Sequence, residues 1–326
     1  MTIAAPLRFP RKLRAVVHDA DTRFVVTGAG GWLGRATLEM LDDALGASMP
    51  DRVHAYAAGE RPYRLRSGRT VQVAALPALA TLPAGRPTAI AHYAFLTREK
   101  TAVMPTNAYV EANRRITAFA VENARRLGAT ATFSTSSGAV YRRDGTLEIS
   151  LDDNPYGALK REEEEAFAAL RQSCGTRAAI CRIFNLSGPF LNKDYALGSI
   201  VADVLADRPI RVRAAHRVVR SYAHVRDVVA AGFAAMLGVG EAPTAPYDTA
   251  GAEAVEVGEL ALRARSALGR PDLAIDRPAP SCAPEDRYVG DGAFFTRLVT
   301  DAGGATASLD DGIRDTAAYL AEAAGA

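Results

Sequence analysis

The sequence predicts an α/β fold in which a doubly wound parallel sheet is followed by a smaller α/β lobe. Short apolar runs alternate with helical patterns over residues 22–184, and a glycine-rich turn joins the first run to the first helix. From about residue 185 the loops lengthen and proline becomes more frequent. Alternating strands and helices build a parallel sheet that helices cover on both faces, and the change of rhythm indicates a second lobe.

The elements follow one another in chain order. Residues 1–21 precede the first strand and are expected to form an N-terminal arm. A strand is expected at Phe24 to Thr27, followed by the turn "TGAGGWLG" and a helix with leucines at helical spacing. Further strands are expected in "RVHAYAA", "TVQVAAL", "TAIAHYAF", "ATATFSTSS" and "RAAICRIFNLSG". Helices are expected in "TNAYVEANRRITAFAVENARRLG" and "YGALKREEEEAFAALRQSCG", each of which ends at a glycine.

Composition limits the classes of protein. The chain has 326 residues, of which 48% are hydrophobic and 23% charged, enough to bury a large core. The formal net charge is only +2 and the basic residues are dispersed, so we expect no nucleic-acid partner. No apolar run approaches the ~20 residues that span a bilayer, and we expect no membrane partner and a cytoplasmic location. The three cysteines and five histidines lack metal-ligand spacing, so no metal site is expected.

The glycine turn predicts a dinucleotide site. Gly28, Gly31 and Gly34 form G-x-x-G-x-x-G between the first strand and a helix that begins near Trp32 and Leu33. Such glycines let the backbone approach a pyrophosphate, and the N–H groups of the helix N-terminus bind the anion. The alternative is a glycine-rich loop with no ligand. We therefore assign residues 22–184 to a dinucleotide-binding Rossmann domain, rejoined by about 218–250, and residues 185–217 and 251–326 to a substrate-binding lobe.

A second pattern bears on catalysis. Tyr156 and Lys160 lie four residues apart and share one helix face. We expect the ammonium to lower the pKa of the phenol, which is ~10 when unperturbed, so that it can exchange a proton with a substrate hydroxyl. Ser134, Ser136 and Ser137 end a strand, where one hydroxyl can bind the reacting oxygen. We interpret the acidic run of residues 162–165 as surface carboxylates favoured by the helix dipole.

In this order the glycine turn, the serines and the Y-x-x-x-K pair resemble the extended short-chain dehydrogenase/reductase family, in its sugar-nucleotide epimerase/dehydratase branch. The segments "TAIAHYAF", "VEANRRIT", "RIFNLSGP" and "VRSYAHVRDVV" extend the resemblance over nearly the whole chain. The resemblance implies that Tyr156 is the acid/base, that Lys160 holds the nicotinamide ribose and that Ser137 is the catalytic hydroxyl. It also implies a homodimer formed through the Tyr156 helix.

The resemblance assigns ligand contacts as well. Asn185 and Arg220 would hold the diphosphate of a nucleotide-linked sugar, together with Ser137 at the reacting carbon. The other arginines near Arg220, such as Arg217, are interpreted as solvated surface residues. The cofactor-binding residues that we expect are Gly28, Gly31, Trp32, Leu33, Gly34, Ala58, Arg61, His92, Ala94, Asn113, Tyr156 and Lys160.

Two departures leave the reaction and the cofactor open. Gly138 and Ala139 follow Ser137 where water-eliminating members carry an acidic pair, which disfavours a 4,6-dehydratase. The second strand ends at Ala58, whereas an acidic side chain there would bind the ribose 2′-OH of NAD. Glu60 can still serve, but Arg61 or Arg64 can meet the 2′-phosphate of NADP, so NADP is slightly favoured over NAD. Three hypotheses for the function are left open: a nucleotide-sugar epimerase or ketoreductase, a dehydrogenase or reductase of a small non-nucleotide alcohol or ketone, and a non-catalytic dinucleotide-binding sensor.

Overall fold

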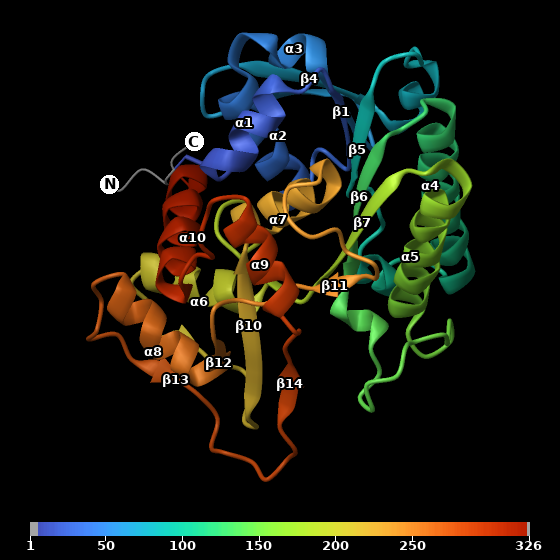
Figure 1. Ribbon diagram of the computed structural model, residues 1–326. Helices are drawn as coiled ribbons and strands as arrows, with labels where there is room; N and C mark the ends of the chain where they lie inside the picture. The colour runs from blue at the N-terminus through green and yellow to red at the C-terminus, as the bar shows by residue number, and fades with distance from the viewer. Residues whose placement is uncertain (1–5, 325–326) are drawn as a thin grey trace.

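The large sheet organises the chain. In the computed structural model, which describes residues 6–324, this sheet has the strand order β11-β7-β6-β5-β1-β2-β4-β3, and all neighbours are parallel except β3 and β4 (Figure 1). The strands, in sheet order, are β11 (Tyr247–Asp248), β7 (Arg177–Ile183), β6 (Ala131–Ser137), β5 (Thr88–His92), β1 (Arg23–Thr27), β2 (Val53–Ala57), β4 (Thr70–Ala75) and β3 (Arg61–Arg64). The chain runs outward from β1 in both directions, which confirms the predicted doubly wound parallel sheet.

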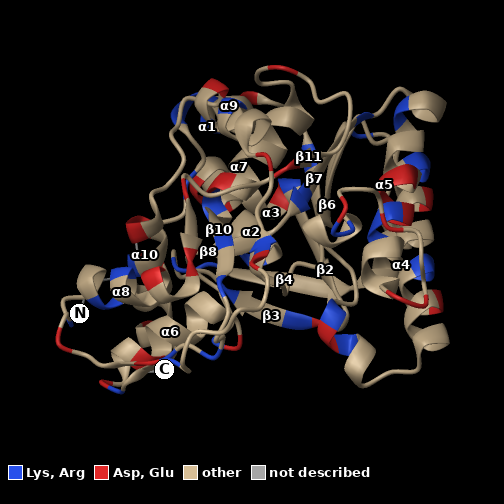
Figure 2. Ribbon diagram, turned by 90° about the horizontal axis from the view of Figure 1, so that it is seen from below, with Lys and Arg blue, Asp and Glu red and all other residues tan. Residues whose placement is uncertain are grey.

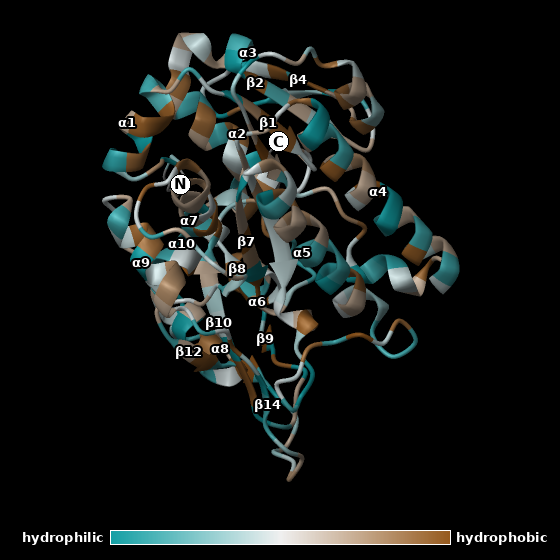
Figure 3. Cartoon of the chain, turned by 45° about the vertical axis from the view of Figure 1, so that its right-hand side comes forward, coloured by the Kyte–Doolittle hydropathy of each residue, from teal (hydrophilic) through white to brown (hydrophobic). Residues whose placement is uncertain are grey.

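Helices cover both faces of this sheet. On one face lie α4 (Thr106–Arg126) and α5 (Pro155–Cys174), and on the other lie α1 (Arg11–Asp19), α2 (Trp32–Leu45) and α7 (Val225–Leu237) (Figure 1). Every residue of β1 and β5 is buried, as expected of parallel strands between two helical layers. Hydrophilic and hydrophobic segments alternate along α4, the pattern of a helix with one face on the core (Figure 3). Short helices in the connections are η1 (Gly46–Ser48), α3 (Met49–Arg52), η2 (Leu76–Thr81), η3 (Arg98–Ala102) and η4 (Gly138–Val140).

The expected N-terminal arm contains α1. Leu13 and Val17 of this helix are completely buried, and α1 packs against α2 and α7. Arg52 donates hydrogen bonds to the backbone carbonyls of Val17 and His18, which fix the end of the helix. The first five residues of the expected arm lie outside the described part of the chain.

A smaller lobe stands beside the carboxyl ends of β6 and β7. Its main sheet has the order β12-β10-β14, with β8 also paired to β10, and β13 pairs with β9. The chain enters the lobe after β7, where Asn185 pairs with Tyr222, so the expected single strand "RAAICRIFNLSG" is divided at Phe184. The lobe's elements are β8 (Asn185–Ser187), α6 (Ala196–Leu205), β9 (Ile210–Arg211), β10 (Val218–His224), β12 (Ala254–Glu256), α8 (Val257–Ala267), β13 (Ile275–Asp276), β14 (Asp286–Tyr288) and α10 (Leu309–Ala324). Between β14 and α10, α9 (Ala293–Asp301) packs on α7 and β11 of the large sheet.

Candidate active site

The glycine turn lies between β1 and α2, at the place where the sheet order reverses. Gly28 has φ +68°, and a Cβ there would lie 2.5 Å from the carbonyl carbon of Tyr93. A Cβ on Gly34 would lie 2.3 Å from the carbonyl oxygen of Gly28. Both positions therefore require glycine for the packing of the chain itself. Gly31 has more room and begins α2 without a side-chain cap, which leaves helix N–H groups for an anion. The turn thus fits the pyrophosphate of a dinucleotide.

Arg61 lies across this turn. A Cβ on Gly30 would be only 1.8 Å from its Nη2 atom, so the guanidinium occupies the space directly over the turn. Ala58, which follows β2, is exposed and offers no carboxylate. A guanidinium at this position is suited to a phosphate group.

An aromatic contact borders the same turn. The ring of Trp32 packs edge-on against Tyr195 with 4.9 Å between centroids. The Tyr195 hydroxyl donates a hydrogen bond to Glu99 of η3. Leu33, by contrast, is buried in the core. Trp32 is therefore at the rim of the turn, and η3 is tied to that rim through Tyr195.

Three further residues that were expected to bind the cofactor, His92, Ala94 and Asn113, have different surroundings. The backbone of Ala94 lies against Gly28, as the 2.6 Å approach of its nitrogen to a Gly28 Cβ indicates. The imidazole of His92 is buried instead, with Nδ1 2.7 Å from the hydroxyl of Thr27. Asn113 is buried on α4, where its amide oxygen accepts a hydrogen bond from the Leu96 nitrogen at 2.8 Å. Asn113 thus holds the chain that leaves β5.

The three expected catalytic residues come together where α5 meets the end of β6. Asn154 caps α5 by accepting a hydrogen bond from Gly157 N, and Pro155 occupies the first turn. Lys160 Nζ donates to the carbonyl of Thr135 at 2.8 Å. Ser137, the last residue of β6, lies close enough to Tyr156 to lower the pKa of its phenol. The hydroxyls of Ser134 and Ser136 are buried without a hydrogen-bond partner, so of the three serines Ser137 is the one that reaches the tyrosine.

The expected effect of Lys160 on the phenol is wrong for this structure. The pKa of Tyr156 is raised to about 12, chiefly by burial; Ser137 lowers it and the charge of Glu163 raises it. The charge of Lys160 does not offset this burial, because its ammonium is paired with the carboxylate of Glu163 at 2.7 Å. Tyr156 is therefore protonated at neutral pH.

The acidic run on α5 was also misinterpreted in part. Glu165 is exposed, but the side chains of Glu163 and Glu164 are only 3% and 1% exposed. Glu163 contacts Lys160, and Glu164 accepts two hydrogen bonds of 2.7 Å from Arg182. A helix turns about 100° per residue, so four successive carboxylates cannot all face solvent. The helical period was therefore the signal in the sequence from which the burial of part of this acidic run could have been predicted.

The lobe brings Tyr288 of β14 to the same place. Its hydroxyl lies 3.4 Å from the hydroxyl of Ser137, and its ring packs on Phe184 with 4.6 Å between centroids. Burial raises the pKa of Tyr288 to about 12. Sequence reasoning missed this residue, because no local pattern links Tyr288 to a serine 151 residues earlier.

The expected substrate contacts lie beside Tyr288. The guanidinium of Arg220 lies 5.9 Å from the Tyr288 ring centroid, and its Nη2 donates to Asp286 at 2.8 Å. The amide of Asn185 donates to the carbonyl of Ser221 at 3.3 Å. Arg220 is thus close to the catalytic cluster, but its charge is paired.

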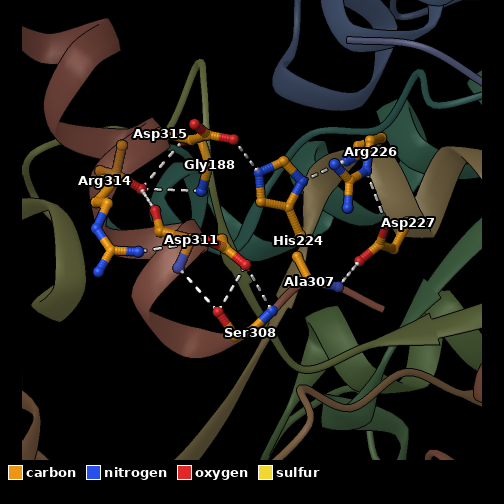
Figure 4. A network of polar contacts seen from close by, with 11 residues as sticks. Gly188, His224, Arg226, Asp227, Ala307, Ser308, Asp311, Arg314 and Asp315 are labelled. Atoms are coloured by element: carbon orange, nitrogen blue, oxygen red, sulfur yellow. Dashed lines mark hydrogen bonds and ion pairs between the residues drawn. The ribbon is translucent and has the colours of Figure 1, made fainter. Parts of the chain in front are cut away.

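A polar network fixes the carboxyl end of β10, the strand that carries Arg220 (Figure 4). His224 Nδ1 accepts a hydrogen bond from Arg226 N at 3.1 Å, so its Nε2 carries the hydrogen and donates to Asp315 at 3.2 Å. Asp227 accepts a bond of 2.6 Å from Ala307 N. These bonds join β10 to α10, and α7 to the segment just before α10, and so hold the lobe against the sheet.

Residues 6–324 show no feature of a membrane span or of a metal site. No helix in this range is both long and apolar enough to cross a membrane. Among the same residues, no three His, Cys, Asp or Glu side chains gather in a way that could hold a metal ion. The cysteines Cys174, Cys181 and Cys282 are free.

Comparisons with known proteins agree with this geometry. A family model described as the NAD dependent epimerase/dehydratase family matches residues 24–245. No curated protein sequence matches the chain.

Solved structures of the same fold come from several bacteria. The UDP-glucose 4-epimerase of Thermotoga maritima, solved with UDP-glucose, is 16% identical with a TM-score of 0.69, over 93% of this chain and 99% of that one. The dTDP-glucose 4,6-dehydratase DesIV of Streptomyces venezuelae, solved with NAD, is 19% identical with a TM-score of 0.70, over 93% and 98%. The UDP-glucose 4-epimerase of Thermus thermophilus, in complex with NAD, is 20% identical with a TM-score of 0.68, over 92% and 99%. At these identities the likeness shows the fold.

Proposed function

Because the chain belongs to the NAD-dependent epimerase/dehydratase family, we propose that it acts on a nucleotide-linked sugar as an epimerase or ketoreductase. The observation that carries the proposal is the meeting of Ser137, Tyr156 and Lys160 at the carboxyl end of β6, on the sheet edge that also carries the glycine turn. Ligands of open α/β sheets bind at this edge, where the strand order reverses.

Each residue has a role in the proposed reaction. A bound nicotinamide dinucleotide would accept or donate hydride. Tyr156 would exchange a proton with the reacting oxygen, and Ser137 would hold that oxygen by a hydrogen bond. Lys160 would bind the nicotinamide ribose. General acid–base catalysis typically contributes about 10²–10⁴-fold, so Tyr156→Phe should lower kcat by at least about 10²-fold while dinucleotide binding is retained.

We propose NADP as the slightly favoured cofactor, with NAD as the alternative. Support comes from the exposed Ala58, which has no carboxylate for a ribose hydroxyl, and from Arg61, whose guanidinium lies over the turn. The test is calorimetry with NADP⁺ and NAD⁺ on wild type and Arg61→Ala. The variant should lose affinity for NADP⁺ by about 10-fold or more and change little for NAD⁺.

The nucleotide-sugar assignment rests on Arg220 and Asn185. Arg220 lies beside Tyr288, and Asn185 pairs with Tyr222 of the strand that carries Arg220, so a diphosphate bound there would place the attached sugar toward Ser137. Guanidinium groups suit phosphate oxygens, and binding of Arg220 to a diphosphate would exchange Asp286 for the ligand. The charge of Arg220 is already paired with Asp286 and so does not require a phosphate partner. This ion pair is the observation that favours the second candidate, a dehydrogenase or reductase of a small alcohol or ketone.

Calorimetry with UDP, dTDP, GDP, CDP and ADP, with the dinucleotide site saturated, separates the two candidates. A hydrogen bond to a charged group contributes about 1.5–3 kcal/mol, so Arg220→Ala should weaken diphosphate binding roughly 10- to 150-fold. Arg217→Ala is the matched control, because Arg217 is exposed on the same segment and pairs with Glu285. If no diphosphate binds the wild type, or Arg220→Ala binds equally well, the small-alcohol enzyme is the better assignment.

Water elimination at the sugar is disfavoured in our proposal. Gly138 and Ala139 follow Ser137, and a Cβ on Gly138 would lie 2.5 Å from the ring of Phe184, so position 138 has no space for an acidic side chain in this conformation. Dehydratases occur among proteins of this fold, and DesIV is one. The test is mass spectrometry of nucleotide hexoses incubated with the enzyme and cofactor. Loss of one water from the sugar would overturn this part of the proposal.

We also propose a homodimer formed through α4 and α5. These helices pack together and carry interspersed acidic and basic residues (Figure 2). A groove of about 400 Å³ runs between them, and Arg114 and Glu162 form an ion pair of 2.6 Å across it. Light scattering should give twice the chain mass, and a charge reversal at Arg114 should shift the equilibrium toward the monomer. The other residues that line the groove include Asn113, Thr117, Val121, Leu159 and Ala166.

A further inference from the structure

Glu163 is a buried carboxylate that the proposed reaction does not use. Its Oε2 lies 2.7 Å from Lys160 Nζ, and its Oε1 lies 3.2 Å from His92 Nε2. The His92 contact is close but poorly aligned for a hydrogen bond, whereas the Lys160 contact is a full one. Lys160 is thus bound on one side by Glu163 and on another by the carbonyl of Thr135. A carboxylate this deep in the protein is retained because it has cationic and hydrogen-bonding partners.

The spacing on α5 puts Glu163 within electrostatic range of Tyr156. Tyr156, Lys160 and Glu163 are at positions i, i+4 and i+7 and lie on one face of the helix. The Lys160 ammonium also lies 3.7 Å from the centroid of the Phe95 ring, which packs edge-on against Tyr156. An unpaired ammonium here would favour the phenolate, because an opposite charge stabilises the ionised form of an acid. An ammonium whose charge is paired with a carboxylate has much less effect on the pKa of the phenol.

We propose that Glu163 is a positioning residue that holds Lys160 against the end of β6 and pairs with its charge, and thereby makes the phenol of Tyr156 harder to ionise. This role rests on the proposed function for its use in catalysis. A protonated phenol can give its proton to the oxygen of a sugar carbonyl, whereas a phenolate can only remove one. The charge of Glu163 is one of the causes that raise the pKa of Tyr156, which agrees with the geometry.

Other charged and titratable groups also face Tyr156. Glu99 of η3 raises its pKa, and Arg98 of the same helix lowers it. These two are next to one another on a surface segment and act in opposite directions, whereas Glu163 is buried with the residue that it neutralises. The remaining titratable neighbours are the phenols of Tyr109, Tyr195 and Tyr288.

The test is a direct titration of Tyr156 that needs no substrate. The full-length chain, which has 11 tyrosines, is labelled with 3-fluorotyrosine, and the ¹⁹F resonance of position 156 is identified by its loss in Tyr156→Phe. Fluorination makes the phenol more acidic, which brings the titration toward the pH range in which the protein is folded. Wild type and Glu163→Gln are compared at equal dinucleotide content. A unit charge about 10 Å away, at an effective dielectric constant of about 20, corresponds to a fall of roughly one pH unit in the midpoint.

Glu165→Gln is the matched control. Glu165 is on the same helix and is exposed, so its removal should leave the midpoint unchanged. If Glu163→Gln does not give the wild-type circular dichroism spectrum, Glu163→Met, which is also uncharged and of similar length, replaces it under the same criteria. An unchanged or higher midpoint without the Glu163 charge, or an equal fall in Glu165→Gln, overturns the proposal. Lack of turnover on every nucleotide sugar would instead reject the proposed function and leave the titration result standing.

Discussion

The close backbone packing around Gly34 suggests a test at this position. A Cβ at this position would lie 2.3 Å from the carbonyl oxygen of Gly28 and 2.6 Å from the Cα of Ala29. Ordinary contact begins near 3.4 Å, so Gly34→Ala must move α2 or the turn by about 1 Å. Gly31→Ala is the matched variant, because its Cβ would be 3.4 Å from the same oxygen and needs no such movement.

Two effects oppose one another in Gly34→Ala. Overpacking costs about 1–3 kcal/mol, whereas replacing glycine by alanine in a helix gains at most about 1 kcal/mol, and less in the first turn. The expected net loss is about 1–2 kcal/mol of unfolding free energy. For a chain of this length that corresponds to a fall in Tm of about 2–3 °C. A 1 Å shift of α2 also misplaces the N–H groups that would bind the pyrophosphate, so dinucleotide affinity should fall at least about tenfold.

Differential scanning calorimetry and isothermal titration with NADP⁺ measure the two quantities. Gly31→Ala should keep the wild-type Tm, and any loss of affinity in that variant reports the approach of the pyrophosphate itself. The reasoning is refuted if Gly34→Ala has the wild-type Tm and affinity, because the turn would then tolerate a Cβ where the geometry excludes one.

Three further predictions concern the lobe and the rim of the site. His224→Ala removes the cap of α7 and should lower the unfolding free energy by about 1–3 kcal/mol in urea denaturation, with the slope m unchanged. Burial raises the pKa of Glu256, but the hydrogen bonds from Arg277 outweigh it and the net pKa is lowered, so this group stabilises the fold above about pH 4.5. Glu256→Gln should therefore be less stable than wild type at pH 7 and approach it as the pH falls below about 4.5, as thermal melts at both pH values would reveal. Tyr195→Phe removes the hydrogen bond to Glu99 and should speed NADP⁺ dissociation about 2- to 10-fold in stopped-flow fluorescence; an unchanged rate would mean that this bond does not retain the dinucleotide.

Local patterns in the sequence determined the fold class and the positions of the main site residues. The glycines of the turn were readable because φ > 0 at Gly28 and close packing at Gly34 are requirements of a few neighbouring residues. Tyr156 and Lys160 were readable because the helical period alone puts them on one face. The predicted strands and helices of the large sheet were confirmed with ends that differ by a few residues, which is the usual uncertainty of helix and strand termini.

The tertiary structure decided what surrounds those residues. The sequence placed Lys160 near Tyr156, but its effect on the phenol depends on Glu163, and the direction in which Glu163 points is set by the packing of α5 on the sheet. Tyr288 reaches Ser137 only because β14 pairs with β10 in the sheet of the lobe, which brings its ring to the end of β6. These contacts join segments far apart in the chain, and neither helical nor strand periodicity carries information about them. Charge pairing and burial follow from such contacts, so the electrostatics of the site could not be predicted from the sequence.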